Sequence, residues 1–260
     1  MSSKKLITVS IVSHGQLELV LPLLEQLNQH SSPIIAKVVL TLNIPEPYLL
    51  ATQKWTYPIV VLENSKVKGF GANHNQAFRQ CETPWFLIMN PDVRLNRDVL
   101  TPLVSLAEAD SGILTPRIQE PSKTEPEQHR KIITPLEILT RRRAGYKRPT
   151  VPEWIPGLFM LFRSAAYSQI GGFDENRYFM YGEDFDICAR TRLAGWMLQV
   201  GEDLLVIHDA RRSSHGSGMH LNWHMTSLLK VWSSRAFWRY RSLDRSQKHA
   251  VGTHTSTRLK

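Results

Sequence analysis

Residues 6–29 read LITVSIVSHGQLELVLPLLEQLNQ, and the first half of the chain repeats their pattern. Residues 6–13 are a short β-branched run that ends at His14-Gly15, which predicts a strand and a turn. Leucines and a valine then recur at helical spacing, which predicts a helix over 16–29. A strand followed directly by an amphipathic helix is typical of the repeating unit of α/β folds.

The same alternation continues to about residue 115. Short apolar runs predict strands at 36–42, 58–62 and 85–89, and a helical pattern covers 72–80. We therefore predict an α/β fold with a Rossmann-like, mostly parallel central sheet flanked by helices, which binds ligands at the carboxyl ends of its strands. Polar residues stand at three of these ends: Ser13-His14, Asn43 and Asn90-Asp92.

The second half of the chain is less regular. Residues 119–152 are rich in prolines and charges and only weakly helical at 132–139, so we expect a mobile excursion over the site. Three further elements are predicted: an apolar run at 154–162, a helix at 183–193 ended by Gly195, and paired short strands at 196–206.

Composition limits the class of protein. The 260 residues, 42% of them hydrophobic, suffice for one large α/β domain or two small ones that share a cleft. No run is long enough for a transmembrane helix, the start is too briefly apolar for a signal peptide, and Cys81 and Cys188 offer no disulfide framework, so we expect a cytoplasmic protein. The net charge of +9 favours anionic partners, whether nucleic acid, phosphorylated small molecules or acidic membranes.

Residues 69–75, GFGANHN, lead straight into the helix predicted at 72–80. Glycines let the backbone approach a ligand, and a helix N-terminus presents unpaired N–H groups to a phosphate. The alternative is an ordinary glycine turn with an asparagine cap. The stretch lacks the spacing of the dinucleotide fingerprint and of the P-loop.

Two places offer ligands for a cation. Asn90-Pro91-Asp92 puts a carboxylate just past a buried strand, where a cation that bridges two phosphates could bind; the alternative is a type I turn. His208 follows an apolar run at 204–207, with His215 further on, and the alternative for His208 is an ordinary surface or cap residue.

Residues 171–186, GGFDENRYFMYGEDFD, place three carboxylates behind an aromatic run. An apolar neighbourhood raises the cost of ionising a carboxylate, which produces a base that works near neutral pH. The alternative is that the acids only complement the dipole of a helix. If Glu183 begins that helix, Asp186 meets Arg190 one turn later as a structural ion pair, whereas Asp184 faces Cys188 and remains available for chemistry.

Taken together and in this order, these motifs resemble inverting family 2 glycosyltransferases of the GT-A fold, especially bacterial rhamnosyltransferases of cell-surface polysaccharide synthesis. The resemblance runs from about Leu6 to Arg212. It rests on five stretches: IVSHG, GFGANHNQAF, FLIMNPDV, GGFDENRYFMYGEDFDICARTRLAGW and HDARR.

The resemblance implies a role for each motif. The donor side would comprise Ser13, His14 and Asn43 around the nucleoside, the loop of Gly71, Asn73 and Asn75 near ribose and diphosphate, and Asn90 with Asp92. Asp92 and His208 would hold Mg²⁺ or Mn²⁺, although Asn90 replaces the first acid of the family's DXD motif. On the acceptor side, Asp184 would be the general base, and Glu183, Trp154 and Tyr181 would bind the acceptor.

The resemblance also implies substrates and place. It favours dTDP-L-rhamnose as donor, a polyprenyl-diphosphate-linked saccharide as acceptor, and lipopolysaccharide or O-antigen synthesis on the inner face of the cell membrane. We expect a nucleotide-sugar-binding half at 1–115, an acceptor-binding half at 116–210 and a basic, aromatic helical tail at 211–260. That tail could bind an anionic membrane or pack on the catalytic domain.

Two rival functions fit parts of the pattern. A sugar nucleotidyltransferase could also use a basic α/β domain and a metal, but it has no use for the Glu183-Asp184 pair. A non-catalytic module that binds nucleic acid or membrane would account for the charge and the aromatic tail, and it would show steep salt dependence on nucleic acid. We expect a glycosyltransferase without a nucleic-acid partner.

Overall fold

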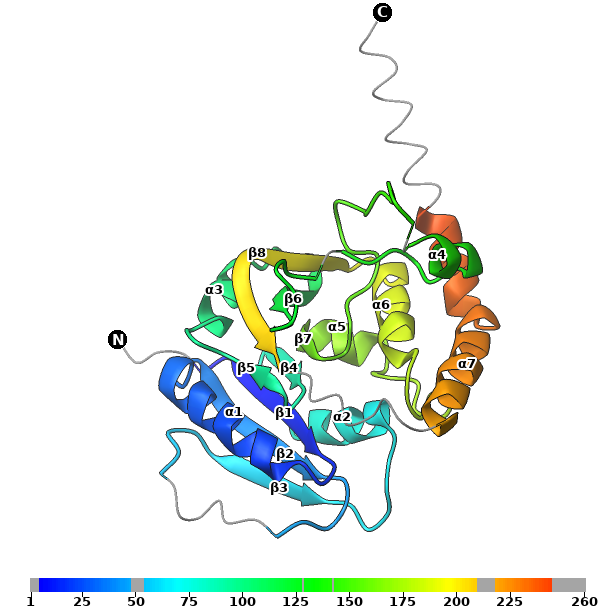
Figure 1. The fold of residues 1–260 in the computed structure, drawn as a ribbon. Helices are drawn as coiled ribbons and strands as arrows, with labels where there is room; N and C mark the ends of the chain where they lie inside the picture. The colour runs from blue at the N-terminus through cyan, green and yellow to red at the C-terminus, as the bar shows by residue number, and fades with distance from the viewer. Residues whose placement is uncertain (1–4, 48–53, 128, 142, 210–217, 245–260) are drawn as a thin grey trace, which may run out of the picture.

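The computed structural model describes residues 5–47, 54–127, 129–141, 143–209 and 218–244, with only the backbone for 218–224. The described chain forms one curled sheet with helices on both faces (Figure 1). The strands are β1 (Ile7–Ser13), β2 (Ile35–Leu42), β3 (Ile59–Glu63), β4 (Trp85–Met89), β5 (Val93–Arg94), β6 (Ser111–Gln119), β7 (Phe159–Arg163) and β8 (Met197–His208). The helices are α1 (Leu17–His30), α2 (Phe70–Phe78), α3 (Leu100–Ser105), α4 (Pro135–Thr140), α5 (Ser164–Gln169), α6 (Glu183–Leu193) and α7 (Gly218–Trp232).

The strand order is β3-β2-β1-β4-β7-β6-β8-β5. Strands β1 to β4 pair in parallel, and β6 pairs in parallel with β8. Strand β7 lies between β4 and β6 and is antiparallel to both, so Phe159 at its start pairs with Met89 at the end of β4. The predicted α/β fold with a mostly parallel sheet is confirmed, and the edge formed by the ends of β1, β2 and β4 also receives the start of β7.

Alternating side chains of β1 divide the core between the two faces of the sheet. Ile7, Val9 and Ile11 pack on one face with α1 and α3. Ser10 points to the other face, where its hydroxyl lies 2.8 Å from Nδ1 of His74 in α2. Residues of α2, α5, α6 and α7 build the second core there. Burial of a sheet between two helical layers explains why its strands read as continuous apolar runs.

Two predictions of secondary structure are wrong. The stretch 71–75 is not a loop, because α2 begins at Phe70, whose N–H donates to the carbonyl of Phe179. The paired short strands predicted at 196–206 are the single strand β8. Gly201 lies within β8, where its pairing with β6 shifts register. Glycine in a strand commonly marks such an irregularity.

Residues 130–133 are not a loose excursion. Arg130 forms a β-bridge with Trp154, and the N–H of Ile132 donates to the Glu153 carboxylate at 2.6 Å. The buried Trp154 indole donates in turn to the carbonyl of Lys131. These bonds attach the segment to the chain that leads into β7.

The described part of the C-terminal tail packs on the domain, which is one of the two expected alternatives. Val231, Phe237 and Tyr240 are buried in the second core, and a further helix covers 235–244. Expectations for Arg211, Arg212, His215, the Trp223 side chain and residues 245–260 fall outside the described residues. Within the described part, no helix combines the length and apolar character needed to cross a bilayer.

Candidate active site

The ends of β1 and β2 bring three of the predicted donor-side residues together. The backbone N–H of Asn43 donates to the carbonyl of Ser13 at 2.8 Å, and the Asn43 amide nitrogen lies 3.2 Å from Nδ1 of His14. The side-chain nitrogen of Asn43 also donates to the carbonyl of Lys68. Its side-chain oxygen accepts from the backbone N–H of Lys68 and from the side-chain amide of Asn64. Asn43 therefore holds the segment before α2 against the sheet edge.

The side chains of Asn73 and Asn75 on α2 already form hydrogen bonds within the protein. Asn73 is buried and donates to the carbonyls of Lys68 and Gly69. The oxygen of Asn75 accepts from the Tyr167 hydroxyl and from the N–H of Phe173. A Cβ on Gly71 would lie 2.5 Å from the Cβ of Phe173, so glycine is needed for close packing there. These three residues join α2 to its neighbours, and direct nucleotide binding by them stays a prediction.

Asp92 and His208 meet at the end of the sheet, as the metal-site prediction requires. Strand β5 pairs with β8 so that Val93 is opposite His208, and Nε2 of His208 lies 3.2 Å from Oδ2 of Asp92. Oδ1 of Asp92 and Nδ1 of His208 are buried without a hydrogen-bond partner. The Asp92 hydrogen bond raises the pKa of His208, against a smaller opposing effect of burial. Unpartnered ligand atoms at a strand end fit a cation site.

The protein supplies few ligands to that cation. Among the residues that the structure describes, no cluster of three His, Cys, Asp or Glu side chains could enclose a metal ion. The Asn90 backbone N–H is bonded to the carbonyl of Leu158, and no acid stands at position 90. Asp92 and His208 thus fit a metal whose other ligands are phosphate oxygens and water, which is the usual arrangement for Mg²⁺.

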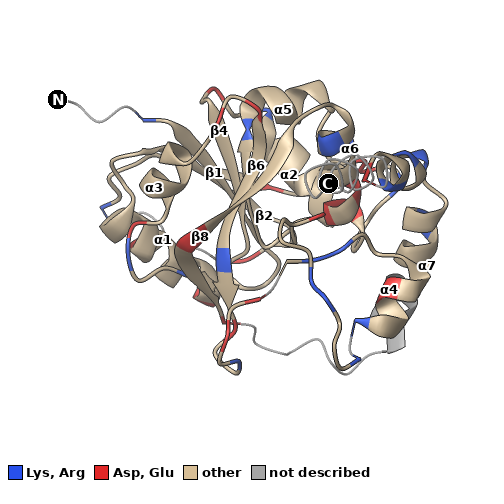
Figure 2. Cartoon of the chain, turned by 90° about the horizontal axis from the view of Figure 1, so that it is seen from above, with Lys and Arg blue, Asp and Glu red and all other residues tan. Residues whose placement is uncertain are grey.

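Helix α6 begins at Glu183, as the sequence predicts, and its first turn carries three acids. Figure 2 shows how acidic and basic residues are distributed over the helices. Gly182 precedes it at φ +86°, a left-handed conformation that glycine adopts without strain. Glu183 is buried, and its Oε2 has no partner. Burial raises the pKa of Glu183, and the neighbouring charge of Asp184 adds to this. Glu183 is therefore readily protonated.

Asp184 experiences the positive charge of Arg130, from a segment remote in the chain. Its Oδ1 accepts from the N–H of Phe185 at 2.8 Å. Burial raises the pKa of Asp184, while the Arg130 guanidinium opposes that rise. A carboxylate whose pKa is raised by burial takes up a proton more readily than an exposed one. The role of Asp184 as general base stays a prediction.

Residues 157–158 connect Asp184 with the donor-side strand ends. A Cβ on Gly157 would lie 3.6 Å from the Cβ of Asp184 and 3.2 Å from the Phe70 ring. The carbonyl of the next residue, Leu158, accepts from the N–H of Asn90. The proposed base therefore lies beside the strand end that carries the proposed metal ligand.

The two other predicted acceptor residues lie in different surroundings. Trp154 is buried, packs edge-on against Phe185 and has the Arg130 guanidinium 4.7 Å from the centre of its ring. Tyr181 is half-buried with φ +69°, a left-handed conformation that is rare for a bulky residue. Such strain is commonly found at ligand sites. Trp154 is therefore less accessible than Tyr181, and acceptor binding by either stays a prediction.

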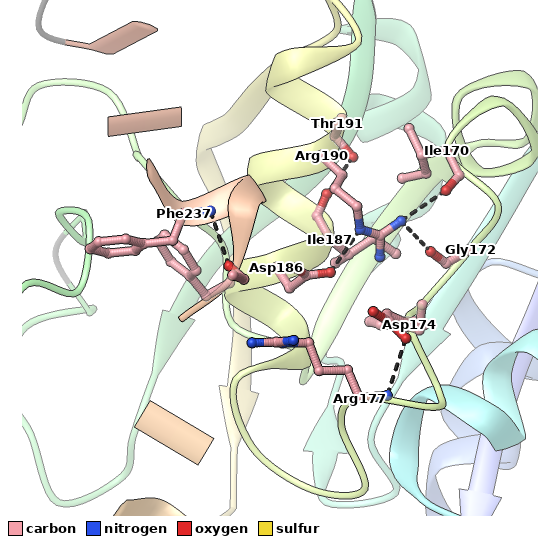
Figure 3. A network of polar contacts seen from close by, with 12 residues as sticks. Ile170, Gly172, Asp174, Arg177, Asp186, Ile187, Arg190, Thr191 and Phe237 are labelled. Carbon is pink, nitrogen blue, oxygen red and sulfur yellow. Dashed lines mark hydrogen bonds and ion pairs between the residues drawn. The ribbon is translucent and has the colours of Figure 1, made fainter. Parts of the chain in front are cut away.

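The ion pair predicted within α6 is confirmed (Figure 3). Nε of Arg190 lies 2.7 Å from Oδ2 of Asp186. Nη1 of Arg190 also donates to the carbonyls of Ile170 and Gly172. Asp186 is therefore a structural residue that fixes α6 to the turn before it.

Arg130 is a site residue that the sequence did not reveal. It acts on Asp184 and pairs with Glu127 at 2.7 Å, although it is remote from α6 in the chain. Its segment has no periodic pattern or motif. Its β-bridge with Trp154 and the hydrogen bond from the Glu153 N–H to its carbonyl bring it to the site.

The model of the family described as "Glycosyl transferase family 2" matches residues 46–168, slightly under half of the chain. This stretch is similar to family 2 glycosyltransferases. Rhamnosyltransferase WbbL of Escherichia coli (strain K12) is 25% identical to it over 92% of this chain and 97% of that protein. The N-acetylglucosaminyl-diphospho-decaprenol L-rhamnosyltransferase of Mycobacterium tuberculosis (strain ATCC 25618 / H37Rv) is 27% identical over 60% of this chain and 57% of its own length.

Solved structures of known glycosyltransferases share this fold. GalNAc-T7 with UDP, GalNAc and Mn²⁺ superposes with a TM-score of 0.63 at 15% identity, covering 82% of this chain and 44% of that one. TarS 1–349 of S. aureus with UDP-GlcNAc gives 0.62 at 14% identity, covering 88% and 67%. The fold is therefore GT-A, as predicted, with the donor-side strand ends and α6 on one sheet.

Proposed function

We propose that this glycosyltransferase moves L-rhamnose from dTDP-L-rhamnose to a hydroxyl of a lipid-linked saccharide, with inversion at the anomeric carbon. The rhamnosyltransferases among its relatives support the sugar, and the decaprenol-linked relative supports the acceptor. The observation that carries the proposal is the position of Asp184 beside the strand end that bears Asp92 and His208.

The transfer requires one base. The acceptor oxygen forms a bond to the anomeric carbon as the bond from that carbon to the phosphate oxygen breaks, and the electron pair leaves with the diphosphate. Asp184 takes the acceptor proton, and Glu183 in its protonated form orients the hydroxyl. A single carboxylate suffices because the phosphate leaves without an acid, in contrast to hydrolases with two working carboxyls.

We propose that Asp92 and His208 hold Mg²⁺ or Mn²⁺ at the donor diphosphate. A divalent cation there would neutralise the negative charge that develops on the leaving diphosphate. Two solved structures with a similar fold contain Mn²⁺, which supports a divalent cation in this protein. Ser13, His14 and Asn43, in the expected donor half at 1–115, would lie against the nucleoside. The expected acceptor half at 116–210 contributes Trp154, Tyr181 and the two acids.

We place this activity in the synthesis of lipopolysaccharide or another cell-surface polysaccharide, at the inner face of the membrane, with peripheral attachment through the C-terminal region. The name of WbbL supports a rhamnosyl product, and the diphospho-decaprenol relative supports a membrane-bound acceptor. Neither the nucleotidyltransferase nor the nucleic-acid module gains support from any contact at the site.

A thermal-shift screen of the full chain tests the donor assignment. We expect dTDP-L-rhamnose with Mg²⁺ or Mn²⁺ to raise the melting temperature more than UDP-GlcNAc or GDP-mannose does. Product analysis with the selected donor then identifies the anomeric configuration. Stabilisation by another sugar nucleotide would refute the rhamnose assignment, and pyrophosphate release from a sugar phosphate and a nucleoside triphosphate would refute the reaction class.

A further inference from the structure

The absent side chain of Gly157 leaves a gap between an aromatic ring of α2 and the proposed base. A Cβ placed on Gly157 would lie 3.2 Å from Cζ and 3.3 Å from Cε1 of Phe70, and 3.6 Å from the Cβ of Asp184. Apart from residues 156 and 158, no other heavy atom of the described chain lies closer to that position. The φ of Gly157 lies outside the left-handed region, so its backbone conformation does not require glycine.

Two neighbouring rings hold the Phe70 ring in place. Its centre lies 4.5 Å from that of the buried His74 ring and 5.7 Å from that of Phe173. His74 is held in turn by Ser10, whose Oγ lies 2.8 Å from Nδ1 of His74. Burial lowers the pKa of His74 to about 3, so this support is neutral. Phe70 is half-buried, and its Cζ and Cε1 edge faces the gap.

The gap lies between the two sides of the proposed reaction. The carbonyl of Leu158 accepts from the N–H of Asn90, which bonds this segment to the strand end that leads to Asp92. Burial raises the pKa of Asp184, and a hydrogen bond from the Gly157 backbone opposes that rise. In the proposed reaction the anomeric carbon lies between the diphosphate at Asp92 and the acceptor hydroxyl at Asp184. The gap beside Gly157 is therefore the place for the donor sugar.

We propose that the edge of the Phe70 ring is an apolar wall that selects the donor sugar by its C6 group. The C6 of L-rhamnose is a methyl group, whereas the C6 of L-mannose carries a hydroxyl, and the two sugars are otherwise identical. A methyl group gains apolar contact with the ring, but a hydroxyl placed there loses its hydrogen bonds to water. The inference rests on the proposed function and adds the residue that distinguishes its donor.

Calorimetric titration of the full chain with dTDP-L-rhamnose, dTDP-L-mannose and dTDP, in the presence of Mg²⁺, tests the wall without an acceptor. We expect the wild type to bind dTDP-L-rhamnose on the order of 10–100-fold more tightly than dTDP-L-mannose, which is the discrimination that an apolar pocket achieves against an added hydroxyl. Phe70→Gln places an amide at the wall, so we expect this ratio to fall about tenfold. Phe70→Leu keeps the wall apolar, and we expect the ratio to stay within about threefold of the wild type.

Phe78→Gln is the matched control on the same helix. The Phe78 ring packs against Phe86 and Tyr167, at 5.1 and 4.4 Å between ring centres, and not against Gly157. We expect its ratio of affinities to stay within about twofold of the wild type. A purely structural role of Phe70 would weaken both sugar nucleotides equally. An unchanged ratio in Phe70→Gln would therefore overturn the proposal.

Gly157→Ala tests the position of the sugar independently of any change at Phe70. The new methyl group occupies the gap, so we expect both sugar nucleotides to bind at least about tenfold more weakly. The affinity for dTDP, which has no sugar to place in the gap, should change less than about twofold. An equal loss of affinity for dTDP would show that the gap does not hold the sugar.

The donor assignment is scored separately by the wild type. If the wild type prefers dTDP-L-rhamnose and Phe70→Gln shows the same preference, the wall is wrong and the proposed function stands. If the wild type prefers dTDP-L-mannose, or binds neither sugar nucleotide, the rhamnose assignment is wrong and the wall falls with it.

Discussion

Nε of Arg190 lies 2.7 Å from Oδ2 of Asp186, one turn apart on α6, and the same guanidinium donates to two carbonyls of the preceding turn. Asp186 is almost fully buried, so loss of its partner leaves a poorly solvated charge. We expect Arg190→Ala to lower the free energy of unfolding by about 3 kcal/mol. Urea denaturation measures this loss.

A double-mutant cycle separates the pair from the rest of the contacts. Asp186→Asn/Arg190→Ala should be less destabilised than the sum of its single variants, because the unpaired charge is gone. If the losses in the free energy of unfolding of the two single variants simply add up in the double variant, Arg190 acts mainly through the carbonyls of Ile170 and Gly172.

Asp184→Asn tests the base. The amide keeps the shape of the side chain but cannot accept the proton, so we expect turnover to fall on the order of 10²–10⁴-fold. Binding of the sugar nucleotide, followed by thermal shift, should stay unchanged. Full turnover by this variant would exclude Asp184 as the base.

The activity of the wild type should decline in acid. Since burial raises the pKa of Asp184, the base becomes protonated at a higher pH than an exposed aspartate does. We expect the acid limb of the pH profile of kcat to lie above the ordinary aspartate range. Arg130→Gln should move that limb further upward, because the arginine opposes the rise in the pKa of Asp184. An unmoved limb would show that another group controls it.

Glu183→Gln should stabilise the protein at alkaline pH. Burial raises the pKa of Glu183 in the folded state, so the folded protein holds a proton that the unfolded chain has released. Stability therefore falls as pH rises from the unfolded pKa through the folded one. We expect the melting temperature of the variant, relative to wild type, to be higher at pH 9 than at pH 5. Glu82→Gln, at an exposed glutamate, should show no such trend.

Removal of the cation should weaken donor binding. We expect EDTA to reduce the thermal shift caused by the sugar nucleotide, and Asp92→Ala to have a similar effect in the presence of metal. His208→Ala should lower the metal affinity less, because Asp92 supplies the charged ligand. A donor-induced shift that is the same with EDTA, and in Asp92→Ala, would contradict metal binding here.

Gly182→Ala should destabilise the start of α6. Its φ of +86° is unfavourable for alanine, and the new Cβ would lie 2.9 Å from Cγ2 of Val231. We expect a loss of about 1–3 kcal/mol in the free energy of unfolding. Gly195 has a similar φ of +94° with open space around it, so Gly195→Ala measures the backbone cost alone. Equal losses would show that the contact with Val231 is unimportant.

The local pattern of the sequence predicted the elements that depend on short-range regularity. Strand β4 and helix α6 have the predicted bounds, because apolar runs and helical spacing are local signals. The pairing of Asp186 with Arg190 followed from spacing alone. The meeting of Asp92 with His208 rested on a resemblance, since no local rule joins residues so far apart in the chain.

Other features depend on tertiary contacts that local patterns do not encode. Gly71 is predicted in a loop, yet it lies in α2, where its missing side chain allows close packing against Phe173. Paired short strands are predicted at 196–206, yet the pairing of β6 with β8 continues past Gly201 with a register shift. Arg130 reached Asp184 through the bridge to Trp154, and irregular segments give no sign of such a contact.

The tail also has a mechanical consequence. The Tyr240 hydroxyl donates to the carbonyl of Glu153, and the Trp232 indole donates to that of Ile133. Ile133 and Glu153 lie on the two segments that meet at the bridge between Arg130 and Trp154, so the last described helices act as a brace for that bridge. A load applied at residue 244 would therefore be transmitted to these two segments first.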